Sequence, residues 1–283
     1  MKTKILTGIL FLLGVFILLY PTVSDYVNSL SQAEVVENYS DEVTRMELAK
    51  LEQEIQRARD YNDNLAKTIV IDPFTESMNE ELSADYASIL NVNGQMGVIS
   101  IPEINVELPI YHGTGPEVLQ KGVGHLQNTS LPVGGEGTHA VLSGHRGLPE
   151  AKLFSDLDEM EIGDKFYIKV LNQTLAYKVD QIKVVEPHQT EALQPVEGED
   201  YVTLVTCTPY AVNTHRLLVR GKRAPFTSEA EEELVWQAES MKQSGSRKLL
   251  FFGAVILVTL IFFYFLFFKS GRDSKGREKR NES

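Results

Sequence analysis

An uncharged run of 20 residues near the C-terminus constrains this chain more than any other feature. It extends from Leu249 to Phe268 and reads LLFFGAVILVTLIFFYFLFF. About 20 apolar residues form a helix long enough to cross the hydrocarbon core of a bilayer. A buried core helix is a poor alternative because the run is apolar on every face. We therefore predict a transmembrane helix over 249–268, with the lipid bilayer as a partner.

A second apolar block lies near the N-terminus. It runs from Ile5 to Tyr20, behind Lys2 and Lys4. Its 16 residues are short for a membrane span, which takes about 17–25 residues. A signal peptide has the same basic start and apolar middle, but no A-x-A-like cleavage site follows Tyr20. Both interpretations stay open, and we favour an uncleaved anchor over 1–21.

Charge predicts the orientation of these blocks and argues against one class of partner. The segment 269–283 holds six Lys or Arg against three Asp or Glu. The positive-inside rule places this basic tail and the N-terminus in the cytoplasm, so the middle of the chain lies outside the cell membrane. The net charge of −12 comprises +2 for 1–21, +5 for 247–283 and −19 for 22–246. A domain this acidic lacks the Lys and Arg clusters that bind nucleic acid.

The external part begins with residues typical of helices. Residues 22–66 are rich in Glu, Leu, Ala, Arg and Gln, and Leu51, Ile55 and Ala58 contribute to an apolar stripe. We predict an extracellular helical region there. For 67–95 we expect a loop around Ile71–Glu76 and a short helix near Glu80–Leu90, which together form a connector.

Residues 96–224 change to short β-rich runs separated by turn residues. Gly, Pro, Asn and Asp separate seven such runs, over 96–102, 106–113, 138–145, 165–171, 174–185, 201–207 and 215–223. This spacing predicts a mainly β fold, a closed barrel or a sandwich. We expect helical insertions near Glu117–Lys121 and Glu150–Leu157.

A juxtamembrane helix is expected over 225–246, before the C-terminal apolar run. Ser228 and Glu231 have the spacing of a capping box, which predicts the start of this helix at Ser228.

The sequence holds a single cysteine, Cys207. One cysteine excludes an intramolecular disulfide framework and every multi-cysteine metal motif. Cys207 ends the β-rich run YVTLVTC, where a scaffold presents side chains to a cleft. Free cysteines are often simply buried, yet an unpaired thiol outside the cell is also a candidate nucleophile. Both interpretations stay open on this residue alone.

Two further residues are candidate partners of Cys207. Among the six histidines, context favours His145, which follows an apolar run in HAVLSGHRG and enters a Gly-bearing turn. Arg216 begins the run RLLVRG, and TPYAVNT is long enough to connect neighbouring strands. A fixed cation beside the cysteine could face a developing oxyanion. There is no HExxH or Cys/His zinc pattern, so we predict neither a metal nor a cofactor.

These elements together resemble the signature of the sortases, the cysteine transpeptidases of Gram-positive cell surfaces. TLVTC, a His about sixty residues earlier and an Arg after the cysteine occur in the family's order. The resemblance covers 96–224 and implies an eight-stranded sortase β-barrel as the catalytic domain. It implies Cys207 as the nucleophile, His145 as the acid and base, and Arg216 as the stabiliser of the transition state.

The segment Ile71–Glu76, IDPFTE, is similar to the lid of class C, pilus-building sortases. The long N-terminal helical region and the C-terminal membrane helix also fit that class. In class C the lid Asp pairs with the catalytic Arg, and the next aromatic residue covers the cysteine. Carried over, these are Asp72 and Phe74, although Trp is frequent at the second position.

Class C membership implies a substrate and a product. The enzyme would cleave an LPXTG-like sorting motif and join pilin subunits through an acceptor lysine. The alternatives are a housekeeping sortase that attaches proteins to the wall precursor, an external cysteine peptidase and a non-catalytic membrane-tethered scaffold.

Overall fold

The computed structural model describes residues 2–65, 70–74 and 82–265. The chain forms two compact units. One unit is Val27–Gln237, and the other combines the chain ends, up to Tyr26 and from Ala238 onward.

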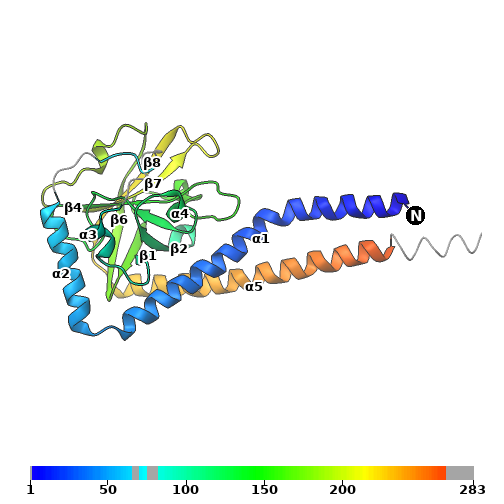
Figure 1. Cartoon of the computed structure of the whole chain (residues 1–283), viewed down its shortest axis with the longest axis horizontal. Helices are drawn as coiled ribbons and strands as arrows, with labels where there is room; N and C mark the ends of the chain where they lie inside the picture. Colours follow the sequence, from blue (N-terminus) through cyan, green and yellow to red (C-terminus); the bar gives the residue numbers. More distant parts are fainter. Residues whose placement is uncertain (1, 66–69, 75–81, 266–283) are drawn as a thin grey trace, which may run out of the picture. The chain divides into compact units, whose positions relative to one another are not determined.

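Eight strands close into a barrel in the order β1-β2-β3-β4-β7-β8-β6-β5. Figure 1 labels β1, β2, β4, β6, β7 and β8 of this barrel. β2–β3 and β4–β7 pair in parallel and all other neighbours are antiparallel. The strands are β1 Gln95–Ile101, β2 Val106–His112, β3 Val123–His125, β4 Thr138–Ser143, β5 Lys165–Val170, β6 Gln173–Val185, β7 Asp200–Thr208 and β8 His215–Ala224. The predicted eight-stranded barrel is confirmed.

The strand β3 is absent from the seven predicted runs. It has only three residues, and glycine occupies two positions of the run Gly122–His125, so no alternation of apolar residues reveals it. Gly124 is needed because a Cβ there would lie 2.3 Å from the carbonyl oxygen of Gly113. This strand therefore depends on a close approach between two backbone segments, which requires glycine, and not on a pattern of apolar side chains.

The helix expected near Glu150–Leu157 is wrong. Turns occupy most of this segment, and only a short 3₁₀ helix, η3, follows at Leu157–Glu159. Leu153 has a φ of +42°, which a right-handed helix does not allow. The Phe154 N–H donates to the carbonyl of His145 at 3.1 Å, nine residues back, instead of to a helical neighbour. The other expected insertion is confirmed by α4, Pro116–Leu119.

The predicted helical region is confirmed as two helices. α1 spans Lys2–Arg45 and α2 spans Leu48–Asn64. The predicted stripe of Leu51, Ile55 and Ala58 is buried, and it belongs to the main core cluster together with barrel residues. α2 therefore packs on the barrel through its apolar stripe.

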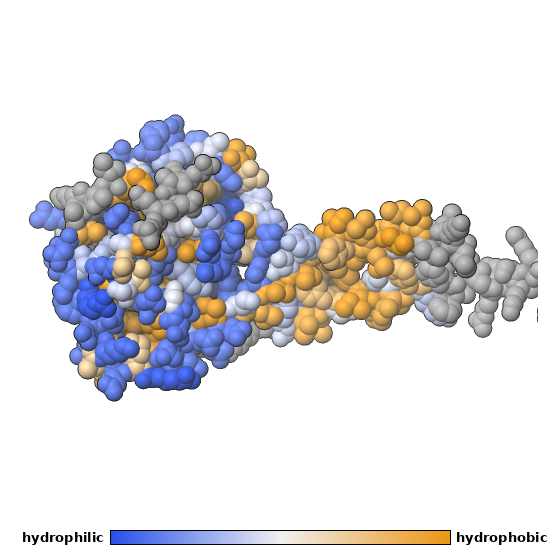
Figure 2. Space-filling view, in the orientation of Figure 1, coloured by the Kyte–Doolittle hydropathy of each residue, from blue (hydrophilic) through white to orange (hydrophobic). Residues whose placement is uncertain are grey.

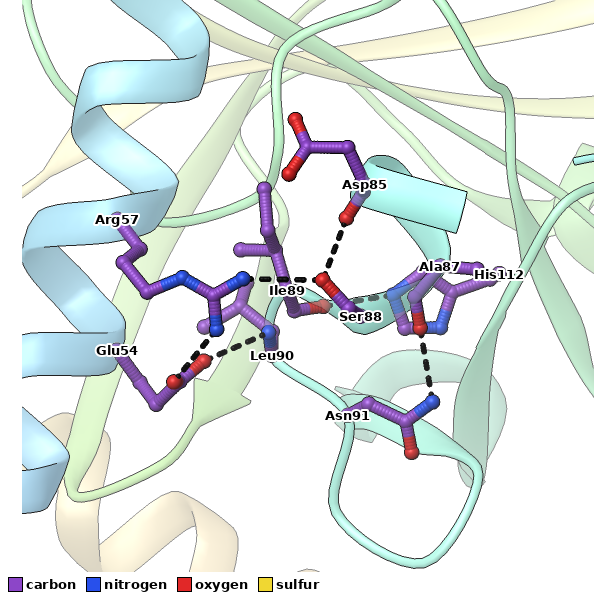
Figure 3. Close-up of polar contacts among 9 residues, drawn as sticks. All are labelled: Glu54, Arg57, Asp85, Ala87, Ser88, Ile89, Leu90, Asn91 and His112. Carbon is purple, nitrogen blue, oxygen red and sulfur yellow. Dashed lines mark hydrogen bonds and ion pairs between the residues drawn. The ribbon is translucent and has the colours of Figure 1, made fainter. Parts of the chain in front are cut away.

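Polar contacts fix α2 to the segment that enters the barrel. Glu54 accepts a hydrogen bond from the Leu90 N–H at 3.4 Å and pairs with Arg57, which donates to Ser88 at 3.0 Å (Figure 3). Ser88 ends the short helix α3, Ala84–Ser88, in the expected region. The chain is thus attached to the barrel on both sides of the segment 70–74.

The helix α5, Ser228–Tyr264, confirms the expected juxtamembrane helix and continues without a break into the apolar run. It begins at Ser228, as predicted, but its hydrogen-bonded cap differs from the expectation. Thr227 caps it, because the hydroxyl of Thr227 accepts from the Ala230 N–H at 3.4 Å. The cap is therefore Thr227, one residue before the predicted Ser228, and Ala230 takes the place of the Glu or Gln that a capping box requires. Two further 3₁₀ helices are η2, Pro102–Ile104, and η4, Glu191–Leu193.

The unit formed by the chain ends is apolar at its surface. Within it, orange side chains cover both helices, whereas the surface of the barrel unit is largely blue (Figure 2). Two helices of the described residues, within Leu6–Arg45 and Ser228–Tyr264, are long and apolar enough to cross a membrane. Phe11 stacks on Phe262 with ring centroids 4.1 Å apart, and Lys248 pairs with Asp25 at 2.9 Å.

Candidate active site

The β7–β8 ladder brings Cys207 and Arg216 together. The strands pair antiparallel, and Cys207 lies directly opposite Arg216. Both side chains are nearly buried, with 9% and 8% of their surface exposed. Because a strand's side chains alternate between faces, this register also places both residues on one face of the sheet. The predicted neighbourhood of these two residues is confirmed.

The carboxylate of Asp72 forms an ion pair with the guanidinium of Arg216. Arg216 Nε donates to Oδ1 of Asp72 at 2.7 Å, and Nη2 donates to Oδ2 at 2.6 Å. Such a two-bond fork between Arg and a carboxylate is among the strongest polar contacts in proteins. Asp72 is 5% exposed, so solvent screens this pair weakly.

The Phe74 ring lies beside both Arg216 and His145. Its ring centroid lies 5.2 Å from Cζ of Arg216 and 5.8 Å from the centroid of the His145 ring. Val70 packs in a small apolar cluster beside the site, and its carbonyl accepts from the hydroxyl of Thr190 at 2.7 Å. The segment 70–74 therefore lies across the site. The rest of the predicted loop, 75–76, falls outside the described residues.

His145 follows β4 by two residues. The Gly144 N–H donates to the carbonyl of Val205 at 3.1 Å, and the Gly144 carbonyl accepts from the hydroxyl of Thr206 at 2.7 Å. Gly144 is needed because a Cβ there would lie 2.7 Å from the Phe154 ring. These contacts place half-buried His145 near the end of β7, on the side of Cys207.

Burial shifts the pKa values of both candidate acid–base groups. Burial raises the pKa of the Cys207 thiol, Arg216 lowers it, and Asp72 raises it further. Burial lowers the pKa of His145. Both shifts favour the neutral thiol and the neutral imidazole in this conformation.

The other five histidines lie in different environments. His139 binds the carbonyl of Gln194 and the hydroxyl of Thr203 through its two ring nitrogens, and burial lowers its pKa to about 4. His112 and His125 are buried around Tyr86. His188 and His215 lie at less buried positions. In the part of the chain that the structure describes, no three His, Cys, Asp or Glu side chains are grouped to hold a metal ion.

The sequence analysis missed two residues that the structure places at this site. Arg146 donates to the hydroxyl of Thr208, the residue after Cys207. Thr190 holds the Val70 carbonyl. The position of Arg146 directly after His145 was a signal, whereas the sequence gives no signal for Thr190.

Comparison with known proteins identifies the family. The description of the matching family model is Sortase domain, and it covers residues 99–224. The crystal structure of sortase C-1 from Streptococcus pneumoniae is 46% identical, covers 69% of this chain and 100% of its own, and superposes with a TM-score of 0.66. The chain belongs to the sortase family. The predicted family resemblance is thereby confirmed, and the family model matches 99–224 of the predicted 96–224.

Other solved sortases agree. Sortase C1 of Streptococcus agalactiae is 49% identical, with 68% of this chain and 95% of that chain covered and a TM-score of 0.63. Sortase C-1 of Actinomyces oris is 47% identical, with 63% and 99% covered and a TM-score of 0.62.

Curated relatives are more distant. Sortase D of Bacillus subtilis is 32% identical over 130 residues, which are 45% of this chain and 63% of the relative. Sortase A of Streptococcus agalactiae is 33% identical over 131 residues, which are 45% and 52%. The chain therefore spans less than two thirds of the length of these curated relatives.

Proposed function

We propose that the protein is a class C sortase, a cysteine transpeptidase that cleaves an LPXTG-like sorting signal and joins pilin subunits through a lysine isopeptide bond. The observation that carries the proposal is the pairing of Cys207 with Arg216, covered by Asp72 and Phe74. The likeness to structures named sortase C supports it.

The first half-reaction forms a thioester. The Cys207 thiolate attacks the Thr carbonyl carbon of the sorting signal, and a C–S bond forms. Arg216 stabilises the negative oxygen of the tetrahedral intermediate. The C–N bond to Gly then breaks, and the His145 imidazolium donates its proton to the departing amine.

The second half-reaction transfers the acyl group. A lysine ε-amine of another pilin attacks the thioester, and the neutral His145 accepts the proton that this amine loses. The C–S bond breaks, the isopeptide bond remains in the product, and the Cys207 thiolate is restored.

We propose that the segment 70–74 is an inhibitory lid. Asp72 occupies the nitrogens of Arg216 that would face the oxyanion, and Phe74 contacts His145. When the lid leaves, the raising effect of Asp72 and part of the burial disappear. The pKa of Cys207 then falls and that of His145 rises, so the reactive thiolate–imidazolium pair becomes more populated.

We propose that the protein resides in the cell membrane, with the catalytic barrel outside and both termini in the cytoplasm. The two apolar helices and the basic flanks of the sequence support this topology. Sorting signals and acceptor lysines would then reach Cys207 from outside the cell.

A second candidate is a housekeeping sortase that attaches proteins to the wall precursor. Relatives named sortase A favour it. The lid segment favours the pilus role, because it supplies both Asp72 and Phe74 at the site.

The test mixes the full chain in detergent with a pilin that bears an LPXTG motif and an acceptor lysine, in wild type and Asp72→Ala. High-mass pilin ladders, absent in Cys207→Ala, are expected. Adducts on a wall peptide without ladders would identify the housekeeping role, and hydrolysis alone would identify a peptidase. No cleavage in Asp72→Ala would overturn the transpeptidase proposal.

A further inference from the structure

The side chain of Arg146 connects three segments around the site. Its Nε donates to the carbonyl of Ser155 at 3.1 Å, its Nη1 donates to Oγ1 of Thr208 at 3.1 Å, and its Nη2 binds the carboxylate of Asp158. The side chain is only 9% exposed. Each of the three guanidinium nitrogens therefore has a protein acceptor, as a buried cation requires.

Arg146 and its partner Thr208 are each adjacent in sequence to a proposed catalytic residue. Arg146 directly follows His145, and Thr208 directly follows Cys207. The bond from Nη1 to Oγ1 therefore joins the neighbour of the proposed base to the neighbour of the proposed nucleophile. Among the residues that the structure describes, this is the one hydrogen bond between Arg146 and Thr208.

The barrel ladder does not extend this far. The β4–β7 pairing ends at Ser143 and Val205, two residues before His145 and Cys207. Beyond that point, two backbone bonds, from Gly144 to Val205 and from Phe154 to His145, act together with side-chain contacts to hold the turn that carries His145. The Gly147 N–H donates to the hydroxyl of Ser155 at 3.1 Å, and the Tyr210 ring lies 6.0 Å from Cζ of Arg146.

Charge alone does not explain the arrangement. Asp158 is 47% exposed, and an ion pair with an exposed partner contributes little stability. A role as a second oxyanion cation is also disfavoured, because the three guanidinium nitrogens already bind Ser155, Thr208 and Asp158.

We infer that Arg146 is a positioning residue, which sets the His145 imidazole relative to the Cys207 thiol through its hydrogen bond to Thr208. The inference rests on the proposed transpeptidase function. Thr208 is the partner in this arrangement. Its hydroxyl accepts the hydrogen bond from Arg146, and this bond fixes the distance between the end of β7 and the turn after β4.

The test uses the full chain in detergent with a sorting-signal peptide, in the lid-opened Asp72→Ala background. Arg146→Ala is expected to lower kcat about 100-fold and Thr208→Val about 10-fold, with KM within about twofold, because small misplacements of catalytic groups cost this much. Thr208→Ser keeps the hydroxyl and is expected to retain kcat. Adding Thr208→Val to Arg146→Ala is expected to lower kcat no further.

The matched control is Arg220→Ala. Arg220 lies on the same strand as Arg216, and its guanidinium is also held by the protein, through a two-bond fork with Asp180 at 3.0 and 2.8 Å. Its loss is expected to lower Tm while kcat stays within twofold. A kcat loss in Arg146→Ala no larger than in Arg220→Ala would overturn the inference. So would a change confined to KM, which would indicate peptide binding.

A second readout is independent of peptide cleavage. The rate of Cys207 alkylation by iodoacetamide is followed against pH, with His145→Ala as reference. If Arg146 positions His145, the Thr208→Val profile moves toward that of His145→Ala and the Thr208→Ser profile does not. An unmoved Thr208→Val profile contradicts the inference. Absence of peptide cleavage in the parent, with the expected profiles, would refute the proposed function alone.

Discussion

The two halves of the candidate site are held by different forces. Backbone pairing fixes Cys207 and Arg216, since they face each other in the β7–β8 ladder. His145 lies beyond the end of the β4–β7 ladder, where isolated backbone bonds and side chains such as Arg146 hold the turn. The barrel therefore fixes the relative positions of the proposed nucleophile, Cys207, and the proposed oxyanion-stabilising cation, Arg216, directly. The proposed acid and base depends on contacts that single substitutions can remove.

In the proposed lid mechanism, the segment 70–74 is the part of the site that must move away from Arg216. Arg216 binds Asp72, whereas Arg220 on the same strand binds Asp180 within the barrel. The first pair joins residues 144 positions apart, from the ladder to the covering segment. The second joins neighbouring strands. In our account only the first pair must break for catalysis.

The largest expected effect lies in the half that the β7–β8 ladder holds. Arg216→Lys keeps a positive charge but loses the planar fork, so we expect kcat in the Asp72→Ala background to fall about 100- to 1,000-fold. Steady-state peptide cleavage measures this. Arg220→Lys is the control and should leave kcat within twofold. If Arg216→Lys retained full activity, the proposed oxyanion role of the fork would be refuted.

A smaller effect tests the proposed lid. Asp72→Ala removes a group that raises the pKa of Cys207, so the thiol should ionise at lower pH. The pH profile of iodoacetamide labelling should then move to lower pH, with at least about tenfold faster labelling at neutral pH. Phe74→Ala should also accelerate labelling by exposing the site.

Asp180→Ala is the control for Asp72→Ala, since it breaks the equivalent fork of Arg220 inside the barrel. It should leave the labelling profile unchanged. Unchanged labelling in both Asp72→Ala and Phe74→Ala would refute the proposal that the segment 70–74 is an inhibitory lid.

The smallest effect tests how the cover is held. Thr190→Val removes the hydrogen bond to the Val70 carbonyl, and a typical hydrogen bond contributes about 1 kcal/mol net. We therefore expect about fivefold faster Cys207 labelling, with Thr190→Ser close to wild type. Equal rates in Thr190→Val and wild type would mean that this bond does not hold the segment.

The predictable part of this molecule is the part governed by local patterns. Alternation and turn residues predicted seven of the eight strands, and the length of TPYAVNT predicted that Cys207 and Arg216 are neighbours. The strand β3 escaped because three residues with a central glycine carry no alternation. The turns at 150–157 escaped because long-range contacts, such as Phe154 to His145, override helix propensity.

Local sequence patterns predicted only part of the candidate site. Asp72 came from family resemblance, since no spacing rule joins it to Arg216 across 144 positions. Arg146 escaped because its partners Ser155, Asp158 and Thr208 are set by the fold. Interactions between side chains that are distant in sequence carry no periodic signal.

The most direct test of the central claim is the intact mass of the Asp72→Ala protein after incubation with an LPXTG-bearing peptide. The account predicts that Cys207 gains the acyl fragment that ends at Thr, which is the mass of the free peptide acid less one water, and that a supplied primary amine releases it. Cys207→Ala should show no adduct. An adduct that persists in Cys207→Ala, or cleavage that proceeds without Cys207, would contradict the claim that this thiol carries the acyl group.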